Sequence, residues 1–248
     1  QVVISRKFSF TLSGDPLKIY QKLRELNPSP YMYFLKHGNS FIIGSSPEML
    51  LRSDSKNVET FPIAGTRPVT RNESLNKRLR NDLLSDEKEI SEHTMLVDLA
   101  RNDLGRVCKY GTVKTKKLMT VKRFSHVQHI VSHVVGRLTH DKDCYDAFKA
   151  LFPAGTVTGA PKVRAMEIID ELERKQRGPY AGALGYFSFN KACDFAITIR
   201  SLFVINSKAY VQAGAGIVMD SIPQREWEET LHKAEALFSA LNLANERK

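Results

Sequence analysis

Long apolar stretches, signal-peptide features and paired cysteines are all missing from this sequence of 248 residues. No apolar run approaches the roughly 18–20 residues that a membrane span needs, and the N-terminus lacks the charged, apolar and small-residue order of a signal peptide. We therefore expect no membrane contact and a soluble, cytoplasmic protein. The cysteines Cys108, Cys144 and Cys193 form no C-x-x-C pair, which favours buried or inert thiols over a disulfide framework or a thiolate metal site.

Charge is unbalanced towards the positive sign. The sequence has 37 Lys and Arg against 27 Asp and Glu, a formal net charge of +10, and its 42% of hydrophobic residues excludes intrinsic disorder. The densest basic run, residues 109–123, contains no acid and only one aromatic residue, Tyr110. Nucleic-acid surfaces usually add stacking aromatics, so we expect no nucleic-acid partner. A basic nucleic-acid-binding module stays open as an alternative. The positive charge could also attract small anionic substrates, or the run could be a solvated charged loop.

Hydrophobic periodicity predicts an α+β fold with antiparallel sheets covered by helices. The predicted strands cover residues 2–12, a meander of short strands at 31–36, 40–44, 48–53 and 58–63, and later runs at 127–135, 195–205 and 209–213. The predicted helices cover residues 17–26, two segments within 73–100, a segment near 145–151 and residues 161–174. The last helix is predicted to be capped by Ser221 and to carry a core stripe of Trp227, Leu231, Ala234, Phe238 and Leu241. Because the sequence opens inside a strand, we expect it to be a piece of a longer protein.

Two of these helices each carry a Glu-x-x-Glu pair, Glu89 with Glu92 and Glu226 with Glu229. The i, i+3 spacing puts both carboxylates of a pair on one helix face. Glu92 also stands on the apolar stripe that continues with Leu96, where a carboxylate needs a cation. Such pairs suit Mg²⁺ together with an anionic substrate, and the alternative is that they are ordinary solvated carboxylates.

Three histidines, His126, His129 and His133, lie in a run whose neighbours predict a strand. In a strand His129 and His133 share one face and His126 points to the other. We therefore expect one structural or catalytic histidine rather than a zinc site.

Glycine-rich segments offer backbone amides that could approach an anion. Residues 153–162 form a glycine-rich loop that leads into a helix and carries the hydroxyls of Thr156 and Thr158, without the signature of a P-loop. Gly214 and Gly216 are similar to the start of a dinucleotide fingerprint, but Met219 replaces the third glycine. Close approach of the backbone to another ligand is the alternative.

Arg200 sits within an apolar run, where a guanidinium either pairs with a buried acid or grips a carboxylate. Together with the glutamate pairs and the glycines, Arg200 predicts a pocket that binds a small molecule with several carboxylates.

Five ordered segments, at residues 61–68, 92–106, 152–162, 177–183 and 212–218, resemble the chorismate-binding enzymes and, among these, the anthranilate synthase component I branch. The resemblance covers essentially the whole chain and corresponds to the C-terminal catalytic portion of a longer subunit. It implies a single chorismate-binding catalytic domain over residues 1–248. The implied fold is a two-layer antiparallel β-sandwich with helices packed outside, here without its N-terminal part.

The resemblance implies Mg²⁺-dependent amination of chorismate at C2 with loss of the C4 hydroxyl, followed by elimination of pyruvate to give anthranilate for tryptophan biosynthesis. Glu92 and Glu229 would hold Mg²⁺ against the ring carboxylate, with Glu89 and Glu226 completing the shell. The residues implied to bind the substrate are Tyr180 and Arg200 at the pyruvyl carboxylate, Thr156, Gly214 and Gly216 at the ring carboxylate, and Gly65 and Thr66.

The implied catalytic residues are Glu48, His129 and Gln1. Glu48 would protonate the C4 hydroxyl, which as hydroxide is a poor leaving group, and His129 would handle a proton or orient the leaving group during loss of pyruvate. Gln1 stands where isochorismate and salicylate synthases have a lysine base, so ammonia is the expected nucleophile. Ala64 stands where aminodeoxychorismate synthases commonly carry a nucleophilic lysine. Aminodeoxychorismate synthase component I is the alternative enzyme.

The resemblance also implies a partner and a regulator. Ammonia would come from a glutamine amidotransferase subunit, anthranilate synthase component II. The segment with Asn27, Pro28, Tyr31 and Met32 matches half of the tryptophan feedback site. The other half belongs to the N-terminal region of the family, so we do not expect this chain to show tryptophan inhibition by itself.

Overall fold

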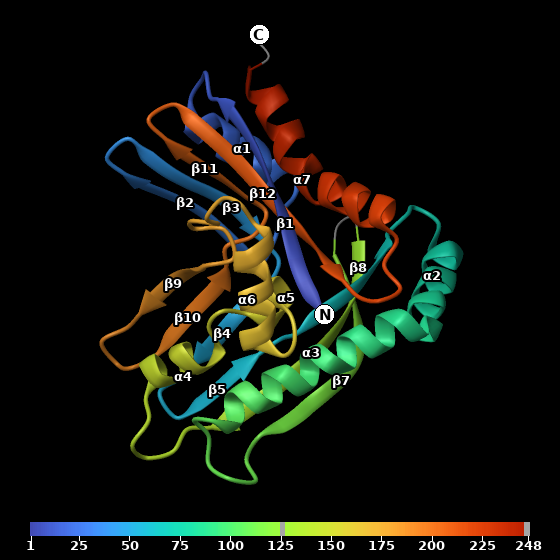
Figure 1. Ribbon diagram of the computed structural model, residues 1–248, viewed down its shortest axis with the longest axis vertical. Coiled ribbons are helices and arrows are strands. Elements are labelled where there is room, and N and C mark those ends of the chain that lie inside the picture. Colours follow the sequence, from blue (N-terminus) through green and yellow to red (C-terminus); the bar gives the residue numbers. More distant parts are fainter. Residues whose placement is uncertain (125–126, 246–248) are drawn as a thin grey trace. The chain divides into compact units, whose positions relative to one another are not determined.

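The computed structural model describes residues 1–124 and 127–245, which are organised in two compact units (Figure 1). The first unit is made of residues 1–47, 157–184 and 196 onward, and the second of residues 48–156 and 185–195. His126 lies outside the described residues. That the whole chain acts as one catalytic domain stays a prediction.

The first unit is built on a five-stranded sheet. Its order is β1 (Val2–Thr11), β12 (Lys208–Ile217), β11 (Ser201–Ile205), β3 (Ser40–Ser46) and β2 (Tyr31–His37). β1 and β12 pair antiparallel along their whole lengths, with Val2 opposite Ile217 and Thr11 opposite Lys208. The helices of this unit are α1 (Pro16–Leu26), α6 (Lys162–Leu172) and α7 (Pro223–Asn245).

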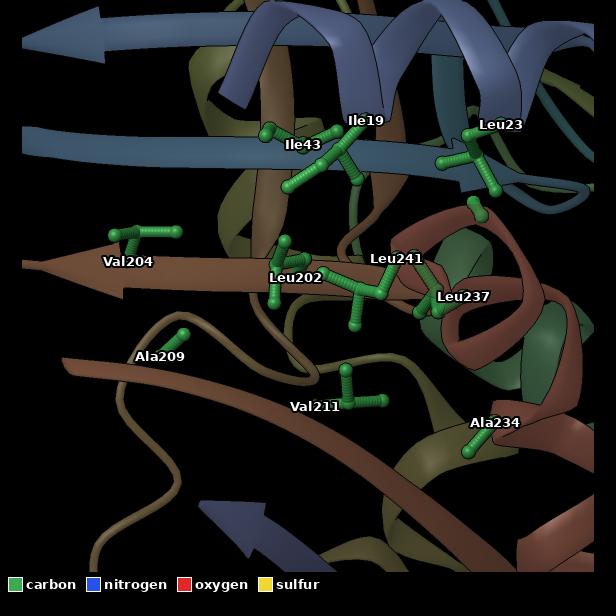
Figure 2. Close-up of a cluster of buried hydrophobic side chains, with 11 residues drawn as sticks. Ile19, Leu23, Ile43, Leu202, Val204, Ala209, Val211, Ala234, Leu237 and Leu241 are labelled. Carbon is green, nitrogen blue, oxygen red and sulfur yellow. The ribbon is translucent and has the colours of Figure 1, made fainter. Parts of the chain in front are cut away.

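The core of the first unit lies where α1 and α7 pack against the sheet (Figure 2). Asp15 caps α1 by accepting a hydrogen bond from the Leu17 amide. The buried members of the core cluster come from both helices and from β3, β11 and β12, and they are Ile19, Leu23, Ile43, Leu202, Val204, Ala209, Val211, Ala234, Leu237, Ala240 and Leu241. Burial of these apolar side chains holds α7 against β12, and both elements carry candidate site residues.

The second unit is built on a seven-stranded sheet. Its order is β6 (Ile63–Pro68), β8 (Val127–Arg137), β5 (Asn57–Thr60), β4 (Met49–Ser53), β10 (Cys193–Ile197) and β9 (Ala183–Phe187), with β7 (Lys114–Arg123) paired to β8. Its helices are α2 (Glu73–Ser85), α3 (Glu87–Gly105) and α4 (Cys144–Leu151). The single turn α5 (Gly155–Thr158) interrupts the glycine-rich loop.

The prediction of an α+β fold with antiparallel sheets and packed helices is confirmed. The predicted meander is wrong at its middle. β3 pairs with β2 and β11, whereas β4 pairs with β5 and lies next to β10, so the chain changes sheet between them. Pro47 lies at this change and has no backbone N–H to continue the ladder.

Two predicted strands are each interrupted. The run predicted over residues 58–63 ends as β5 at Thr60 and resumes as β6 at Ile63, with Pro62 between them. The run predicted over 195–205 is divided into β10 and β11, because Arg200 adopts a left-handed φ of 52° at the break. Strand β9 was not predicted.

The basic run at 109–123 contains strand β7, which was not predicted from its charge. Among the described strands β7 pairs with β8 alone, and its register shifts between Thr115 and Lys117 and again between Lys117 and Thr120. Lysines along an unpaired strand edge are a common way to prevent edge-to-edge association. The alternative of a charged loop is therefore wrong for residues 114–123.

The last helix begins one residue later than its predicted cap implies. The Ile222 carbonyl accepts the first helical hydrogen bonds, whereas the Ser221 hydroxyl accepts from the Val218 amide and so closes the preceding turn. Trp227 is 55% exposed and Leu231 is 41% exposed, so the predicted core stripe of α7 is wrong at its first two positions.

The three cysteines are free and buried, as predicted. Within residues 1–124 and 127–245, no helix combines the length and apolar character that crossing a membrane requires.

Candidate functional site

His129, Gly65 and Thr66, three predicted site residues, meet in the second unit. His129 on β8 is the direct partner of Thr66 on β6. Its Nδ1 lies 2.8 Å from the Gly65 carbonyl oxygen and 3.1 Å from Thr66 Oγ1. Because a carbonyl oxygen can only accept, Nδ1 carries the hydrogen, and the basic lone pair of the neutral ring is on Nε2. The arrangement therefore sets His129 up to take or return a proton at Nε2.

Gly65 lets α3 approach β6 closely. The residue has a φ of 65° at a bulge between Ala64 and Thr66. A Cβ atom at this position would lie 2.9 Å from Leu83 Cδ1 and 3.1 Å from Glu89 Oε2. Glycine thus admits the Glu89 carboxylate beside the strand that carries Thr66.

Glu89 is held there by Arg67, which binds three carboxylates. Its Nη1 lies 3.2 Å from Glu89 Oε1, while Nε and Nη2 donate to Asp82 and Asp86 at 2.6 and 2.8 Å. Asp86 also caps α3 by accepting from the amides of Lys88 and Glu89. The role of Arg67 was not predicted from the sequence.

Burial raises the pKa of the Glu89 carboxyl above its ordinary value, Arg67 opposes this shift, and the negative charge of Glu92 adds to it. Glu92 is half-buried on the same face of α3 as the buried Leu96, as predicted. Two adjacent hard oxygen donors that repel each other are the kind of group that a divalent cation stabilises, so this pair fits Mg²⁺.

Two further predicted residues of the second unit are Glu48 and Thr156. Glu48 comes directly before β4 and is 7% exposed. Thr156 lies in α5, and its buried Oγ1 has no hydrogen-bond partner among the described residues. A buried hydroxyl without a partner is costly unless a ligand supplies one, which fits the predicted role of Thr156 in binding a carboxylate.

In the first unit, Lys233 joins three predicted site residues. Its Nζ lies 2.5 Å from Glu229 Oε1 and 2.9 Å from the Gly214 carbonyl oxygen, and its own carbonyl accepts from Arg200 Nη1 at 3.3 Å. Sequence reasoning missed Lys233. The available signal was its position four residues after Glu229 on α7, where opposite charges attract.

Tyr180 is 4% exposed and lies beside Gly214, since a Cβ at that glycine would be 2.9 Å from the Tyr180 hydroxyl. Burial raises the pKa of Tyr180 to about 12, and the positive charges of Arg177 and Arg200 act in the opposite direction. Tyr180 is therefore a neutral phenol at pH 7 and keeps its O–H as a hydrogen-bond donor. Tyr180 therefore lies beside Gly214, and the charge of Arg200 acts on its hydroxyl. The roles predicted for Tyr180 and Arg200 at one carboxylate and for Gly214 at the other stay predictions.

The remaining predicted residues of the first unit occupy defined positions. Gly216 pairs with Val3 across β12 and β1. The Gln1 backbone exchanges hydrogen bonds with Ala160, since its amino group donates to the Ala160 carbonyl at 3.1 Å and its carbonyl accepts from the Ala160 amide at 3.0 Å. Glu226 is 8% exposed on α7, whereas Glu229 is more open.

The segment predicted to bind tryptophan follows α1. Asn27 caps the C-terminus of α1, and its carbonyl accepts a hydrogen bond from the Ser45 hydroxyl. Pro28 and Pro30 are exposed, and Tyr31 and Met32 open β2 opposite Ser46 and Ser45, with Met32 half-buried against the core. Their role in feedback stays a prediction.

The four predicted magnesium ligands belong to two units, Glu89 and Glu92 to the second and Glu226 and Glu229 to the first. Within either unit, the described residues contain no group of three or more His, Cys, Asp or Glu side chains that could hold a metal. A magnesium site built from both pairs stays a prediction.

Comparisons with known proteins show the family to which the chain belongs. Residues 1–239 match the family described as chorismate binding enzyme. The chain is 57% identical over 246 residues to anthranilate synthase component 1 of Acetivibrio thermocellus and 56% identical over 246 residues to that of Methanothermobacter thermautotrophicus, in each case over 99% of this chain. It covers 50% and 53% of those proteins, so the chain spans about half the length of the curated relatives it matches.

Solved structures show the same likeness. The crystal structure of anthranilate synthase component I from Streptococcus pneumoniae is similar with a TM-score of 0.89 and 49% identity, over 95% of this chain and 52% of that one. The menaquinone-specific isochorismate synthase of Escherichia coli is similar with a TM-score of 0.85 and 28% identity, over 97% of this chain and 56% of that one. The chain therefore belongs to the chorismate-binding enzyme family.

Proposed function

We propose that this chain carries the catalytic site of an anthranilate synthase, which converts chorismate and ammonia to anthranilate and pyruvate with Mg²⁺ in tryptophan biosynthesis. The observation that carries the proposal is the identity of 50–57% over nearly the whole chain to relatives named anthranilate synthase component 1. A glutamine amidotransferase subunit supplies the ammonia. Tryptophan acts at the segment from Asn27 to Met32 when the rest of that site is present.

The choice of ammonia as nucleophile is supported by two side chains. The Gln1 amide cannot deprotonate water. Ala64 is buried on β6 opposite Ile130, and its methyl group cannot form a covalent bond to the substrate. Ammonia therefore adds directly to C2 of chorismate, which favours the 2-amino product over the 4-amino product.

Departure of the C4 hydroxyl needs an acid. Glu48 donates this proton from its buried position before β4. After amination the C2 proton must leave as pyruvate is eliminated, and Nε2 of His129 accepts it. The hydrogen bond from His129 Nδ1 to the Gly65 carbonyl orients the ring for this step.

The carboxylates of chorismate are bound by neutral donors and one fixed cation. Tyr180 and Arg200 hold the pyruvyl carboxylate, and Thr156 with the backbone at Gly214 and Gly216 holds the ring carboxylate. Gly65 and Thr66 line the ring. Lys233 keeps Gly214 and Glu229 in place through its two hydrogen bonds.

The four glutamates fit Mg²⁺ by their chemistry, because all are hard oxygen donors and Glu89 and Glu92 repel each other. When bound, Mg²⁺ neutralises charge on the ring carboxylate and helps to withdraw electrons from the ring. Glu92 and Glu229 would hold Mg²⁺, with Glu89 and Glu226 completing the shell.

The test is anthranilate fluorescence from the purified chain with chorismate and ammonium, with and without Mg²⁺. We expect fluorescence that disappears on addition of EDTA and returns with Mg²⁺. Glu229→Gln should lose Mg²⁺-dependent turnover, whereas the matched change Glu228→Gln, at an exposed glutamate bonded to Gln224, should keep it. Product that appears only after a separate lyase is added would indicate aminodeoxychorismate synthase, and salt-sensitive retention of nucleic acid without turnover would indicate the basic binding module.

A further inference from the structure

Arg177, in the loop between α6 and β9, makes four hydrogen bonds although only 14% of its side chain is exposed. It forms a bidentate pair with Glu173, through Nε at 2.9 Å and Nη2 at 2.7 Å. Nη2 also donates to the Val3 carbonyl at 2.7 Å, and Nη1 donates to the Val157 carbonyl at 2.6 Å. One guanidinium therefore joins β1, the end of α5 and the loop after α6.

Glu173 extends this network to β12. Its Oε1 accepts from both the amide and the hydroxyl of Ser5 at 2.8 Å. The Ser5 hydroxyl in turn accepts from Gln212 Nε2 at 2.7 Å. Only 8% of the Glu173 side chain is exposed, so the carboxylate at the centre of this network is largely shielded from water.

Each segment tied by Arg177 carries or adjoins a proposed carboxylate ligand. Val157 follows Thr156 directly, and Gln212 lies two residues before Gly214. The Val3 side chain lies 3.0 Å from where a Cβ of Gly214 would be. The Arg177 guanidinium carbon also lies 5.7 Å from the centre of the Tyr180 ring.

A buried ion pair is not by itself an efficient source of stability, because removing two charges from water offsets their attraction. The geometry points to another role. We propose that Arg177 and Glu173 are a positioning pair, which fixes Tyr180 and the backbone around Gly214 and Val157 so that the carboxylates of the substrate are bound. This inference rests on the proposed function.

The guanidinium is needed for its shape as well as its charge. Its planar fork donates in three directions at once, to one carboxylate and two carbonyls, and the single ammonium of a lysine cannot reproduce this pattern. A neutral pair of glutamines at positions 173 and 177 would satisfy each other's side-chain polar groups. It would not reach both the Val3 and the Val157 carbonyls.

The experiment compares Arg177→Lys, Glu173→Gln and the double variant Glu173→Gln/Arg177→Gln with the parent chain. The measurements are the melting temperature, the KM for chorismate and the KM for ammonium, all at saturating Mg²⁺. Glu173→Gln leaves a buried guanidinium without its carboxylate and should lower the melting temperature most. Arg177→Lys should raise the KM for chorismate at least tenfold and leave the KM for ammonium unchanged.

The double variant separates positioning from stability. We expect its melting temperature to return towards that of the parent while its KM for chorismate stays at least tenfold raised. Ile19→Ala, a cavity variant in the core under α1, serves as the control that lowers the melting temperature without changing either KM. A double variant with the parent KM, or a control whose KM rises as much as that of Arg177→Lys, overturns the positioning role.

Failure of the proposed function gives a different result. A parent chain that converts no chorismate under these conditions overturns the proposed function, and the equilibrium binding of chorismate then decides the positioning role. A parent that binds chorismate while the double variant binds it at least tenfold more weakly supports the role. Equal binding by the two, or none by the parent, overturns it.

Discussion

The ring of Tyr33 lies over Gly44, its direct partner across β2 and β3. A Cβ atom at Gly44 would overlap the ring and the hydroxyl of Tyr33. The ring is buried, and its hydroxyl lies 2.6 Å from Ser201 Oγ. An aromatic residue that covers a cross-strand glycine in this way fills the space that the missing side chain leaves.

We expect Gly44→Ala to destabilise the first unit by about 1–3 kcal/mol, the range found for overpacking of a tight interior. The free energy of unfolding in urea measures the change. Gly105→Ala is the matched control, because nothing lies within 4 Å of a Cβ at Gly105 and its φ is not in the left-handed region. Equal stability of Gly44→Ala and the parent would show that the Tyr33 ring moves aside at little cost.

The Tyr33 hydroxyl gives a pH dependence with a defined sign. Burial raises the pKa of Tyr33 to about 12, and the hydrogen bond with Ser201 opposes this shift. The pKa of Tyr33 in the folded chain exceeds the unfolded value of about 10. The contribution of its neutral side chain to the free energy of unfolding is therefore complete below pH 10 and is lost as the pH rises towards 12. The loss is at most about 2–3 kcal/mol.

Urea unfolding at pH 9, 10 and 11 checks this dependence. Tyr33→Phe loses about 1 kcal/mol at pH 9, because the hydroxyl's hydrogen bond is removed, but its stability should fall less steeply with pH than that of the parent. Parallel pH profiles for the two proteins would mean that Tyr33 ionises as readily in the folded chain as in the unfolded one.

Local sequence signals predicted the elements whose apolar pattern is unambiguous. The strand predicted over residues 2–12 and the helix predicted over residues 17–26 both appear where expected, as β1 and α1. β7 was not predicted, because its sequence shows no alternation of apolar and polar residues. It is an edge strand with exposed lysines on both faces and two register shifts. The division between β10 and β11 was not predicted, because no sequence signal in this largely apolar run indicates the left-handed conformation of Arg200.

The candidate site divides in the same way. Glu89 was found from its Glu-x-x-Glu spacing, Tyr180 from the segment 177–183 that resembles the family, and His129 from the resemblance as a whole. Arg67 could not be found in this way, because Asp82, Asp86 and Glu89 lie on other elements and only the folded backbone brings them to it. The contact of Lys233 with Gly214 was hidden in the same way, although its i, i+4 spacing to Glu229 was visible in the sequence. Ion-pair partners of this kind depend on which elements pack together, and hydrophobic periodicity does not predict that.

Gly65 offers a direct test of how Glu89 is placed. Gly65→Ala introduces strain at a φ of 65° and pushes against Leu83 and Glu89, whereas Gly38→Ala introduces similar strain at a φ of 57° with nothing within 4 Å. Both should lose about 1–2 kcal/mol from the left-handed backbone. Only Gly65→Ala should also lose Mg²⁺-dependent anthranilate formation, by more than tenfold, with a weaker apparent affinity for Mg²⁺. If both variants keep the Mg²⁺ dependence of the parent, the Glu89 carboxylate need not stay beside β6.

His129 yields the sharpest prediction about the chemistry, because its tautomer is fixed by the Gly65 carbonyl. Nitrogen-15 NMR of histidine-labelled protein at pH 8 should show the Nδ1–H tautomer for His129, whereas the exposed His37 should show the Nε2–H form that free imidazoles prefer. His129→Asn keeps an N–H donor for the Gly65 carbonyl but has no base. It should lower kcat by about 10²–10⁴, the usual contribution of a positioned base, and leave the KM for chorismate within about threefold of the parent. An unchanged kcat would remove His129 from the proton transfer, and an Nε2–H signal would show that the hydrogen bond to Gly65 does not set the ring.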